Sequence, residues 1–244
     1  MEAPGQESVL VLDEDRPLGE MVPAGSLERA RLASIAAVLR RPAGLWDADV
    51  DADVARNGFG LLVLEGALVR GIGVDGRFGA ELLAAGDLLR PWQHDGAGGV
   101  LAFEMEWRIV APVRLAALDL RWATRMAPYP SVAAELTGRA LDRSRRLATL
   151  MAISQQPRLD QRVWLLFWEL ADRHGTVHPD GVHLRLRLTH EVISHLVAAR
   201  RPSVSAARTR LAKRGVLRRH GPEWVLTGPP PDAAAVTPRT ESRR

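Results

Sequence analysis

Short apolar runs separated by glycines fill the middle of the chain, between residues 58 and 120. They include "FGLLVLEG", "ALVRGIGVDG", "RFGAELLAAGD" and "VLAFEMEWRIVAP". The stretch "VDGR" (74–77) predicts a hairpin turn, because Asp-Gly accepts positive φ at both central positions. In "LAFEMEWRIVA" apolar and polar residues alternate, as a half-buried strand requires. Its apolar face carries Leu101, Phe103, Met105 and Trp107. The pattern predicts a small antiparallel barrel or sandwich.

Helical spacing replaces this pattern on both sides. Before it, "LERARLASIAAVLR" (27–40) places apolar residues at helical intervals and predicts a helix. After it, Pro130 and Ser131, a candidate N-cap, introduce a helix that Pro157 stops. The stripe along this second helix consists of Leu136, Ala140, Arg143, Leu147, Leu150 and Ser154, and Leu141 and Met151 widen it. A six-turn helix usually buries such a stripe on a partner, which predicts self-association; packing on the chain's own barrel is the alternative.

The C-terminal third changes rapidly from helix to turn to strand. "QRVWLLFWELADRHG" predicts a helix that Asp160 caps and Gly175 ends. "HPDG" (178–181) predicts a turn and "VHLRLRL" a strand. Thr189 is positioned to cap "HEVISHLVA", and "RRPSVSAARTRLAKRG" predicts a second helix that Gly215 ends. "VLRRH-GPE-WVL" then predicts a hairpin, and the Pro-rich tail predicts disorder.

A helix, a tight turn, a helix and a hairpin in this order predict a winged helix-turn-helix. The expected class is therefore α+β: a small antiparallel barrel or sandwich, a long helix and the winged module. The expected segments are a helical or irregular lead-in (1–54), the barrel or sandwich (55–130), the long helix (131–157), the winged module (158–228) and a disordered tail (229–244).

The charge distribution favours a nucleic-acid partner for the winged module. The formal net charge of the whole chain is only +4. Residues 185–220 hold 10 basic residues and one acidic residue, a net charge of +9, whereas residues 1–184 hold 20 basic and 25 acidic residues. A basic block of this kind is typical of a DNA-binding surface, and a solvated basic face is the plainer alternative.

Composition excludes several other classes. The chain has no cysteine, which rules out disulfides, thiolate metal sites and iron–sulfur clusters. No apolar run is long enough to span a membrane, and the acidic N-terminus does not resemble a signal peptide, so we expect a cytoplasmic protein. We expect no catalytic residues, no cofactor and no metal site: the Asp-rich "WDADVDADVA" lacks the glycine and glutamate of a calcium loop, and His174, His178 and His183 lack a carboxylate at ligand spacing.

The second helix of the winged module has the features of a helix that enters the major groove. Arg200 and Arg201 stand at its N-terminus, where the helix dipole and free amide groups favour phosphate. Pro202 is tolerated in the first turn because its missing N–H would have no partner there. Val204, Ala207 and Leu211 share a face that can pack on Ile193, Leu196 and Val197. Ser203, Ser205 and Ala206 are left to face the groove.

The stretch "LTHEVISHLVAARRPSVSAARTRLAKRGVLRR" resembles the Crp/Fnr family of bacterial transcription regulators. The matching positions are Thr189, Glu191, Leu196, Val197, Arg201, Ser203, Val204, Leu211, Gly215 and Leu217. The order of a small barrel, a long helix and a winged module agrees as well, so that the resemblance covers roughly residues 55–228. The resemblance implies that residues 55–130 form a β-roll sensor domain of the double-stranded β-helix type and that residues 131–157 form a dimerisation helix. It implies a homodimeric DNA-binding regulator, with double-stranded DNA and a second copy as partners and RNA polymerase as a candidate third.

The resemblance also implies where DNA would be contacted. Arg201 occupies the place of the base-reading arginine that binds guanine O6 and N7. Pro202 and Ala206 stand where relatives often carry a glutamate and a second arginine, which predicts a different operator. The expected base contacts are Arg201, Pro202, Ser205 and Ala206. The expected phosphate contacts are Thr189, Arg200, Ser203 and Thr209 in the two helices and Arg218, Arg219 and His220 in the wing.

The sensor half departs further from the family. Cyclic-nucleotide-binding relatives hold the ribose with Gly-Glu and the phosphate with Arg-Ser/Thr/Ala, but here Pro91 and Trp92 stand near the first pair and no Arg-Ser follows. Glu104 and Glu106 would repel a phosphate. We therefore expect no cyclic nucleotide, an unknown small-molecule effector or none, and a candidate effector pocket at Arg90, Trp92 and Trp107.

Three alternatives stay open from the sequence. One is a regulator that binds a cyclic nucleotide through an atypical cassette. Another is a ligand-binding or protein-interaction scaffold that does not bind DNA. Haem binding through His94 is a third, against which stands the simpler interpretation of a histidine in a turn.

Overall fold

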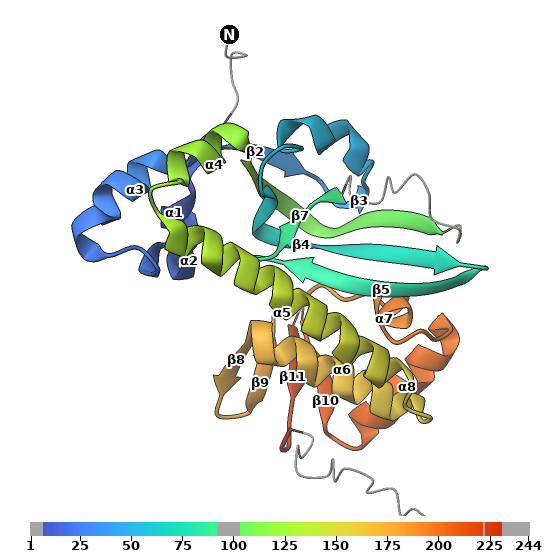
Figure 1. The fold of residues 1–244 in the computed structure, drawn as a ribbon. Coiled ribbons are helices and arrows are strands. Elements are labelled where there is room, and N and C mark those ends of the chain that lie inside the picture. The colour runs from blue at the N-terminus through green and yellow to red at the C-terminus, as the bar shows by residue number, and fades with distance from the viewer. Residues whose placement is uncertain (1–6, 92–102, 222, 231–244) are drawn as a thin grey trace, which may run out of the picture. The chain divides into compact units, whose positions relative to one another are not determined.

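The computed structural model describes residues 7–91, 103–221 and 223–230. The chain divides into two compact units, Met1–Met151 and Ala152–Arg244, and each is described by itself (Figure 1). Within the described residues, no helix has both the length and the apolar character that a membrane crossing needs.

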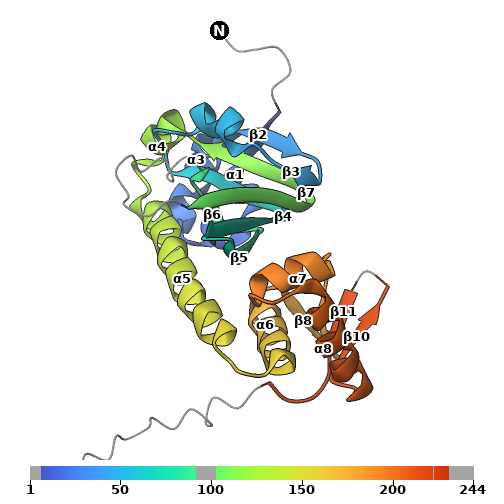
Figure 2. The same cartoon turned by 90° about the vertical axis from the view of Figure 1, so that its right-hand side faces the viewer.

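The first unit is built around an antiparallel sheet. Its seven strands are β1 (Ser8–Leu10), β2 (Ile35–Arg41), β3 (Gly44–Leu45), β4 (Gly60–Val74), β5 (Arg77–Ala84), β6 (Leu88–Leu89) and β7 (Glu104–Leu118). The main order is β1-β2-β7-β4-β5, with β3 on β7 and β6 on β4 (Figure 2). The long strands β4 and β7 pair along almost their whole length, with register shifts between Val63 and Leu68 that bend the sheet.

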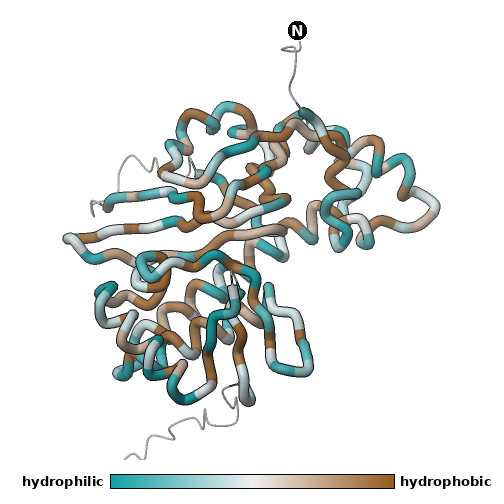
Figure 3. The backbone as a smooth tube through the Cα atoms, turned by 180° about the vertical axis from the view of Figure 1, so that it is seen from behind, coloured by the Kyte–Doolittle hydropathy of each residue, from teal (hydrophilic) through white to brown (hydrophobic). Residues whose placement is uncertain are grey.

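The predicted hairpin and strand alternation are present in this sheet. β4 turns into β5 at Asp75 and Gly76, whose φ angles of 50° and 68° match the positive values that the Asp-Gly signal requires. On β7, Trp107 and Ile109 are buried while Glu104 and Glu106 are exposed. Phe103 is exposed, and Leu101 lies outside the described residues. Hydrophobic and hydrophilic segments alternate along the strands of the tube in Figure 3.

Two apolar cores lie on the two faces of this sheet. One contains Leu61, Val63, Leu68, Trp107 and Leu115. The other contains Leu62, Ala116 and Leu118 and is covered by helices. These helices are α1 (Val11–Glu14), α2 (Arg16–Glu20), α3 (Leu27–Ala33), α4 (Leu120–Met126) and the start of α5 (Pro130–Ser154), and the unit also has 3₁₀ turns η1 (Ala24–Ser26) and η2 (Ala48–Val54).

The helix predicted for residues 27–40 is wrong in its second half. α3 ends at Ala33, and the chain continues as β2, which pairs with β7. Ser34 makes the change possible because its buried polar groups are all bonded: its hydroxyl donates to Arg31 O at 2.7 Å, and its carbonyl accepts from Val11 N and Trp122 Nε1. The lead-in is therefore part of the sheet unit rather than a separate segment.

The second unit has the order that the sequence predicts, with one more strand, β8 (Gly175–His178), which was not predicted; the strand predicted for "VHLRLRL" ends at Leu184. It consists of α6 (Leu159–His174), β8 (Gly175–His178), β9 (Gly181–Leu184), α7 (His190–Leu196), α8 (Arg201–Lys213), β10 (Leu217–His220) and β11 (Glu223–Leu226), with sheet order β10-β11-β9-β8. Two details of α6 differ from expectation. Its N-cap is Arg158, whereas Asp160 lies buried in the first turn. Gly175 follows the helix in extended conformation rather than with positive φ, because it starts β8.

Candidate nucleic-acid interface

The two helices α7 and α8 are held together by their apolar faces. Thr189 caps α7, its hydroxyl oxygen accepting from Val192 N at 3.2 Å, as predicted. The predicted contact residues of both helices are fully or almost fully buried: Ile193, Leu196, Val197, Val204, Ala207 and Leu211. The turn between the helices contains Ala198, a residue other than glycine with a positive φ of 50°. The side of α8 that is opposite to this buried face therefore points away from α7.

The predicted base-contact residues lie on this outward side. Arg201, Pro202 and Ala206 are exposed and Ser205 is half-buried. Of the predicted phosphate contacts on α8, Arg200 is the N-cap and makes no side-chain cap bond, and Ser203 is exposed. The hydroxyl of Thr209 donates to Ser205 O at 3.0 Å, so its proton is engaged within the helix.

The two arginines of the wing point to opposite faces of the small sheet, because successive strand residues alternate. Arg219 is the cross-strand partner of Trp224 and its guanidinium carbon lies 5.5 Å from the indole centroid. Arg218 faces the other way and donates to Asp180 Oδ2 at 2.9 Å. His220 is exposed at the end of β10. Arg219 is therefore the wing cation that lies on the α8 side, while the charge of Arg218 is balanced by Asp180.

Two residues that the sequence interpretation did not single out complete the basic cluster. Arg208 lies over the same indole, with its guanidinium carbon 5.4 Å from the Trp224 centroid, and its Nη1 donates to His190 Nε2. Arg208 follows Arg201 by seven residues, two helical turns, so that the spacing alone would have placed both on one side of α8. His190 directly follows the Thr189 cap. We call Arg201, Arg208, Arg219 and His190 the α8–wing cluster.

The electrostatics of His190 reflect how closely these cations gather. Burial lowers the pKa of His190 from its ordinary value, and the positive charges of Arg208, Arg201 and Arg219 lower it further. Burial also lowers the pKa of Arg208, with repulsion from Arg219 as the second cause. The cluster therefore has an uncompensated positive potential that an anion would relieve.

The arginines of this surface have no carboxylate partner. Among the described residues, no carboxylate forms an ion pair with Arg200, Arg201, Arg208 or Arg219. Some arginines elsewhere in the unit do have one: Arg185 pairs with Glu223 at 2.6 Å, and Arg214 lies 3.6 Å from Asp160. Cations that no carboxylate neutralises are suited to binding phosphate.

The three histidines near the end of α6 do not converge on one point suited to a metal. His183 bonds to Glu223 at 3.1 Å and to Asp180 at 2.9 Å, and the ring of His178 lies 4.3 Å from that of His183. Within the described ranges, no group of three or more histidine, cysteine, aspartate or glutamate side chains is arranged to hold a metal ion. His183 instead links the turn after β8 to β11.

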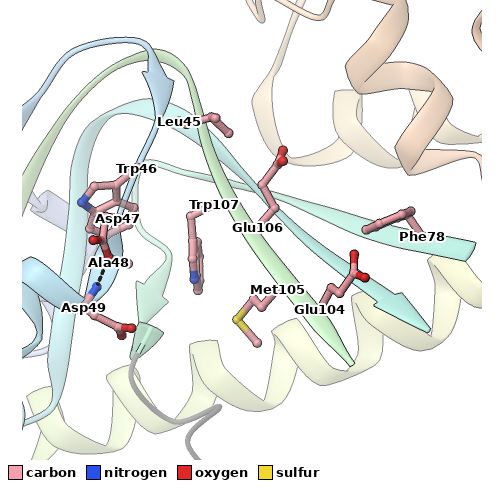
Figure 4. Close-up of a pocket in the computed structure, with 10 residues that line it drawn as sticks. All are labelled: Leu45, Trp46, Asp47, Ala48, Asp49, Phe78, Glu104, Met105, Glu106 and Trp107. Atoms are coloured by element: carbon pink, nitrogen blue, oxygen red, sulfur yellow. Dashed lines mark hydrogen bonds between the residues drawn. The ribbon is translucent and has the colours of Figure 1, made fainter. Parts of the chain in front are cut away.

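In the first unit, two of the three predicted effector residues line cavities, and the linings of two cavities share Met105 and Trp107. One cavity is lined by Asp47, Asp49, Glu104 and Glu106 together with Trp46 (Figure 4). The other contains Arg90 and Trp107 and is basic, with Arg70 and Arg143. The third predicted residue, Trp92, and the haem candidate His94 fall outside the described residues.

Two residues of the stripe predicted on α5 pack on the helix's own unit. Leu136 is fully buried in the sheet unit's core, and Arg143 bonds to Glu81 Oε2 at 2.9 Å. Arg139 and Arg146, on the same side of α5, bond to Asp15 and Asp87. The side left exposed carries Ala134, Thr137, Leu141, Ser144, Ala148 and Met151, while Ala140 is also exposed and Leu147, Leu150 and Ser154 are half-buried.

Comparison with known proteins agrees with this architecture. Residues 161–229 match the Crp-like helix-turn-helix domain family. Solved structures similar to the chain include a cyclic nucleotide-binding domain containing protein from Listeria monocytogenes EGD-e, at 13% identity and a TM-score of 0.60 over 86% of this chain and 96% of that one. A CooA mutant from Carboxydothermus hydrogenoformans is 16% identical, with a TM-score of 0.56 over 78% and 82% of the two chains.

FixK2 from Bradyrhizobium japonicum is similar as well, at 17% identity and a TM-score of 0.56 over 79% of this chain and 93% of that one. No curated protein matches the sequence. At these identities the structural matches establish the shared fold, whereas the domain family establishes the nature of the second unit.

Proposed function

We propose that this DNA-binding regulator is a homodimer that binds specific DNA sequences and that its sensor unit binds no cyclic nucleotide. The proposal starts from the Crp-like helix-turn-helix domain at residues 161–229 and from the fold, which the chain shares with Crp/Fnr-family regulators. The observation that carries the proposal is the set of arginines without carboxylate partners around α8 and β10, described above. In this proposal α8 enters the major groove, which admits a single helix.

We assign the residues of the proposed interface to base contacts and phosphate contacts. Arg201, exposed in the first turn of α8, is the proposed reader of a guanine, and the neighbouring Pro202 and Ala206 offer apolar contact to a thymine methyl. Thr189, Arg200 and Ser203 are the proposed phosphate contacts of the helices, and Arg219 and His220 those of the wing. Arg208 and His190 join them from the side of Trp224. Thr209 and Arg218 contribute less because each is bonded within the protein.

The proposed dimer uses the exposed side of α5. Its residues Ala134, Thr137, Leu141, Ser144, Ala148 and Met151 are spaced alternately by three and four, which is the spacing of a coiled-coil seam. Leu141 is 62% exposed, which is unusual for a leucine in the middle of a helix of this length. Most of the other seam residues are small, and small residues let two helices approach closely. The predicted stripe contributes through its flanking members, Ala140, Leu147, Leu150 and Ser154.

Selection of bound sequences from a random DNA pool tests the function. We expect a two-fold symmetric site whose half-sites lie one helical turn, about 34 Å, apart. Affinity should fall steeply with salt, because each neutralised phosphate contributes about −0.9 to the slope of log K against log salt. A flat salt dependence would favour the scaffold interpretation, in which the winged module contacts protein.

Arg201→Ala separates base reading from general attraction to DNA. We expect a loss of about 1–3 kcal/mol on the selected site and a relaxed preference at one base pair, with non-specific binding little changed. Arg121→Ala, an exposed arginine of α4, is the matched control because it removes the same charge from the other unit. If Arg201→Ala binds as tightly and as selectively as the wild type, the base-reading role is refuted.

A further inference from the structure

His190 is the one member of the α8–wing cluster whose charge can change near neutral pH. It is the first residue of α7, directly after the Thr189 cap, and its side chain is half-buried. The other members are arginines, which remain charged throughout the physiological range. The protonation of His190 therefore decides the total charge of the cluster.

The charged groups that face His190 are all cations. From α8, Arg208 donates through its Nη1 to His190 Nε2, and Arg201 adds a second positive charge. From β10, Arg219 adds a third. The indole of Trp224 on β11 holds two of these arginines close together, with the guanidinium carbons of Arg208 and Arg219 at 5.4 Å and 5.5 Å from its centroid. A proton on His190 would therefore add to a positive charge that is already concentrated.

The bond between Arg208 and His190 requires the neutral form of the histidine. A guanidinium group has N–H donors and no acceptor, so His190 Nε2 must offer its lone pair and the ring proton lies on Nδ1. Protonation of Nε2 would turn this acceptor into a donor and place two positive charges against each other. Burial and the neighbouring arginines accordingly keep the pKa of His190 below its ordinary value of 6.5. In the free protein, neutral His190 thus holds the Arg208 side chain.

No carboxylate within the described part of the chain bonds to or pairs with His190, and the adjacent Glu191 is exposed. His183 in the same unit shows the contrast. It lies between Asp180 and Glu223, and its pKa is raised by its hydrogen bonds to Glu223 and Asp180. A protonated His190 therefore needs an anion from outside the described part of the chain.

We propose that His190 is a proton-dependent contact for a DNA phosphate, neutral in the free regulator and protonated in the complex. In the complex, a phosphodiester oxygen accepts from His190 Nε2 and from the guanidinium of Arg208, which the histidine no longer holds. Binding of DNA then takes up about one proton per module from the solvent. This inference rests on the proposed function, which supplies DNA as the anion.

The affinity for DNA consequently rises as the pH falls. A phosphate favours the charged form of His190, so that its pKa is higher in the complex than in the free protein. A group that holds its proton more firmly in the complex strengthens binding as the pH falls from the higher of the two pKa values towards the lower. Each pKa unit between the two states corresponds to about a tenfold change in affinity per module.

Binding of the full-length protein to two duplexes at constant salt tests the inference. One duplex carries the site selected from the random pool and the other is a random sequence of the same length, because a phosphate contact does not depend on sequence. Fluorescence anisotropy should show binding about tenfold tighter at pH 6 than at pH 8. Calorimetry in buffers of different ionisation enthalpy should show proton uptake near pH 6.5. Proton NMR of the His190 ring should give a pKa below 6.5 without DNA and a higher one with it.

Variants separate His190 from other histidines. His190→Gln keeps an acceptor for Arg208 but cannot take up a proton, so it should bind like the wild type at pH 8 and lose the gain at pH 6. His190→Arg carries a permanent charge and should bind at pH 8 about as tightly as the wild type does at pH 6. His220→Gln is the matched control, because it removes an exposed histidine of the same proposed interface and should leave the uptake at His190 in place.

Three results would overturn the inference: equal affinity at both pH values, a His190 pKa that DNA leaves unchanged or lowers, or undiminished proton uptake in His190→Gln. Its failure is distinguishable from that of the proposed function. A protein that binds the duplexes with a steep salt dependence but without proton uptake refutes only the role of His190. A protein that binds neither duplex at any pH refutes both.

Discussion

In the proposed interface, Arg208 is a residue at which we expect stability and DNA binding to oppose each other. It lies half-buried against Trp224, bonded to neutral His190 and repelled by Arg219. A cation in such a place weakens the folded module, since burial and like charge both disfavour its charged form. In the proposed complex, a DNA phosphate would supply the counterion that Arg208 lacks within the protein.

Replacing Arg208 by methionine should therefore have two opposite effects. The variant keeps most of the apolar contact with Trp224 and loses the charge, so we expect a modestly higher melting temperature together with weaker DNA binding. The slope of log K against log salt should become shallower by about 0.9, the contribution of one phosphate. Arg185→Met, which removes an arginine already paired with Glu223, should change the slope less. A variant that loses stability and affinity together would make Arg208 a structural residue only.

Ala198 offers a second prediction at the residue scale. Its φ of 50° places an alanine in the left-handed region in the turn between α7 and α8. This conformation costs an L-residue roughly 1–2 kcal/mol, and glycine avoids that cost but loses more backbone entropy. Ala198→Gly should thus raise the free energy of unfolding by up to about 1 kcal/mol, measured by urea denaturation. The neighbouring Ala199→Gly has no such strain to relieve and should lower it.

At the scale of elements, the features with local signals were predictable from sequence. The turn at Asp75 and Gly76, the cap of Thr189 and the helix between Pro130 and Pro157 each depend on residues that are adjacent in the chain. The change from α3 to β2 at Ser34 was not predictable, because it depends on bonds to Val11 and Trp122, which are distant in sequence.

The same distinction applies to the candidate site. The outward side of α8 follows from its helical period and was predicted, as was the exposure of Arg201. The ion pair of Arg218 with Asp180 was not, since Asp180 is brought to Arg218 by the pairing of β9 with β11. Likewise, the orientation of α5 is decided by Asp15, Glu81 and Asp87, three carboxylates of the sheet unit that no periodicity within the helix reveals.

The small sheet of the winged module contains a pH-dependent link. The pKa of His183 is raised above its ordinary value of 6.5, first by the hydrogen bond to Glu223 and then by that to Asp180. A raised pKa in the folded state means that His183 contributes its full stabilisation below about pH 6.5 and loses it as the pH rises through the raised value. The lowered pKa values of Asp180 and Glu223 keep both carboxylates charged throughout this window.

We therefore expect the amides of β9 and β11 to be better protected from hydrogen exchange at pH 6 than at pH 8, after correction for intrinsic exchange. His183→Gln should remove the difference. His190 has the opposite effect on the pH dependence of stability. Because its pKa is lowered in the folded protein, protonation of His190 destabilises the module as the pH falls. The comparison is therefore best made in a His190→Gln background. Equal protection at both pH values in that background would contradict the link.

At the scale of the whole molecule, α5 is the element that carries the proposed dimer contact. Its one side is bound to the sheet unit through three arginine–carboxylate pairs, and its other side carries the proposed seam. The proposed dimer would join two winged modules, as a site with two half-sites about 34 Å apart requires.

This arrangement makes Leu141 the most informative position for the assembly. Leu141→Glu places a carboxylate at the centre of the seam, where two copies would oppose like charges in a desolvated contact, so we expect a monomer in analytical ultracentrifugation. Leu120→Glu, an equally exposed leucine on α4, should leave the mass unchanged. Since each module keeps its own surface, the monomer should still bind a single half-site weakly but lose the tight binding of the paired site, because two linked modules gain from effective concentration. A Leu141→Glu protein that remains a dimer would exclude this side of α5 as the interface.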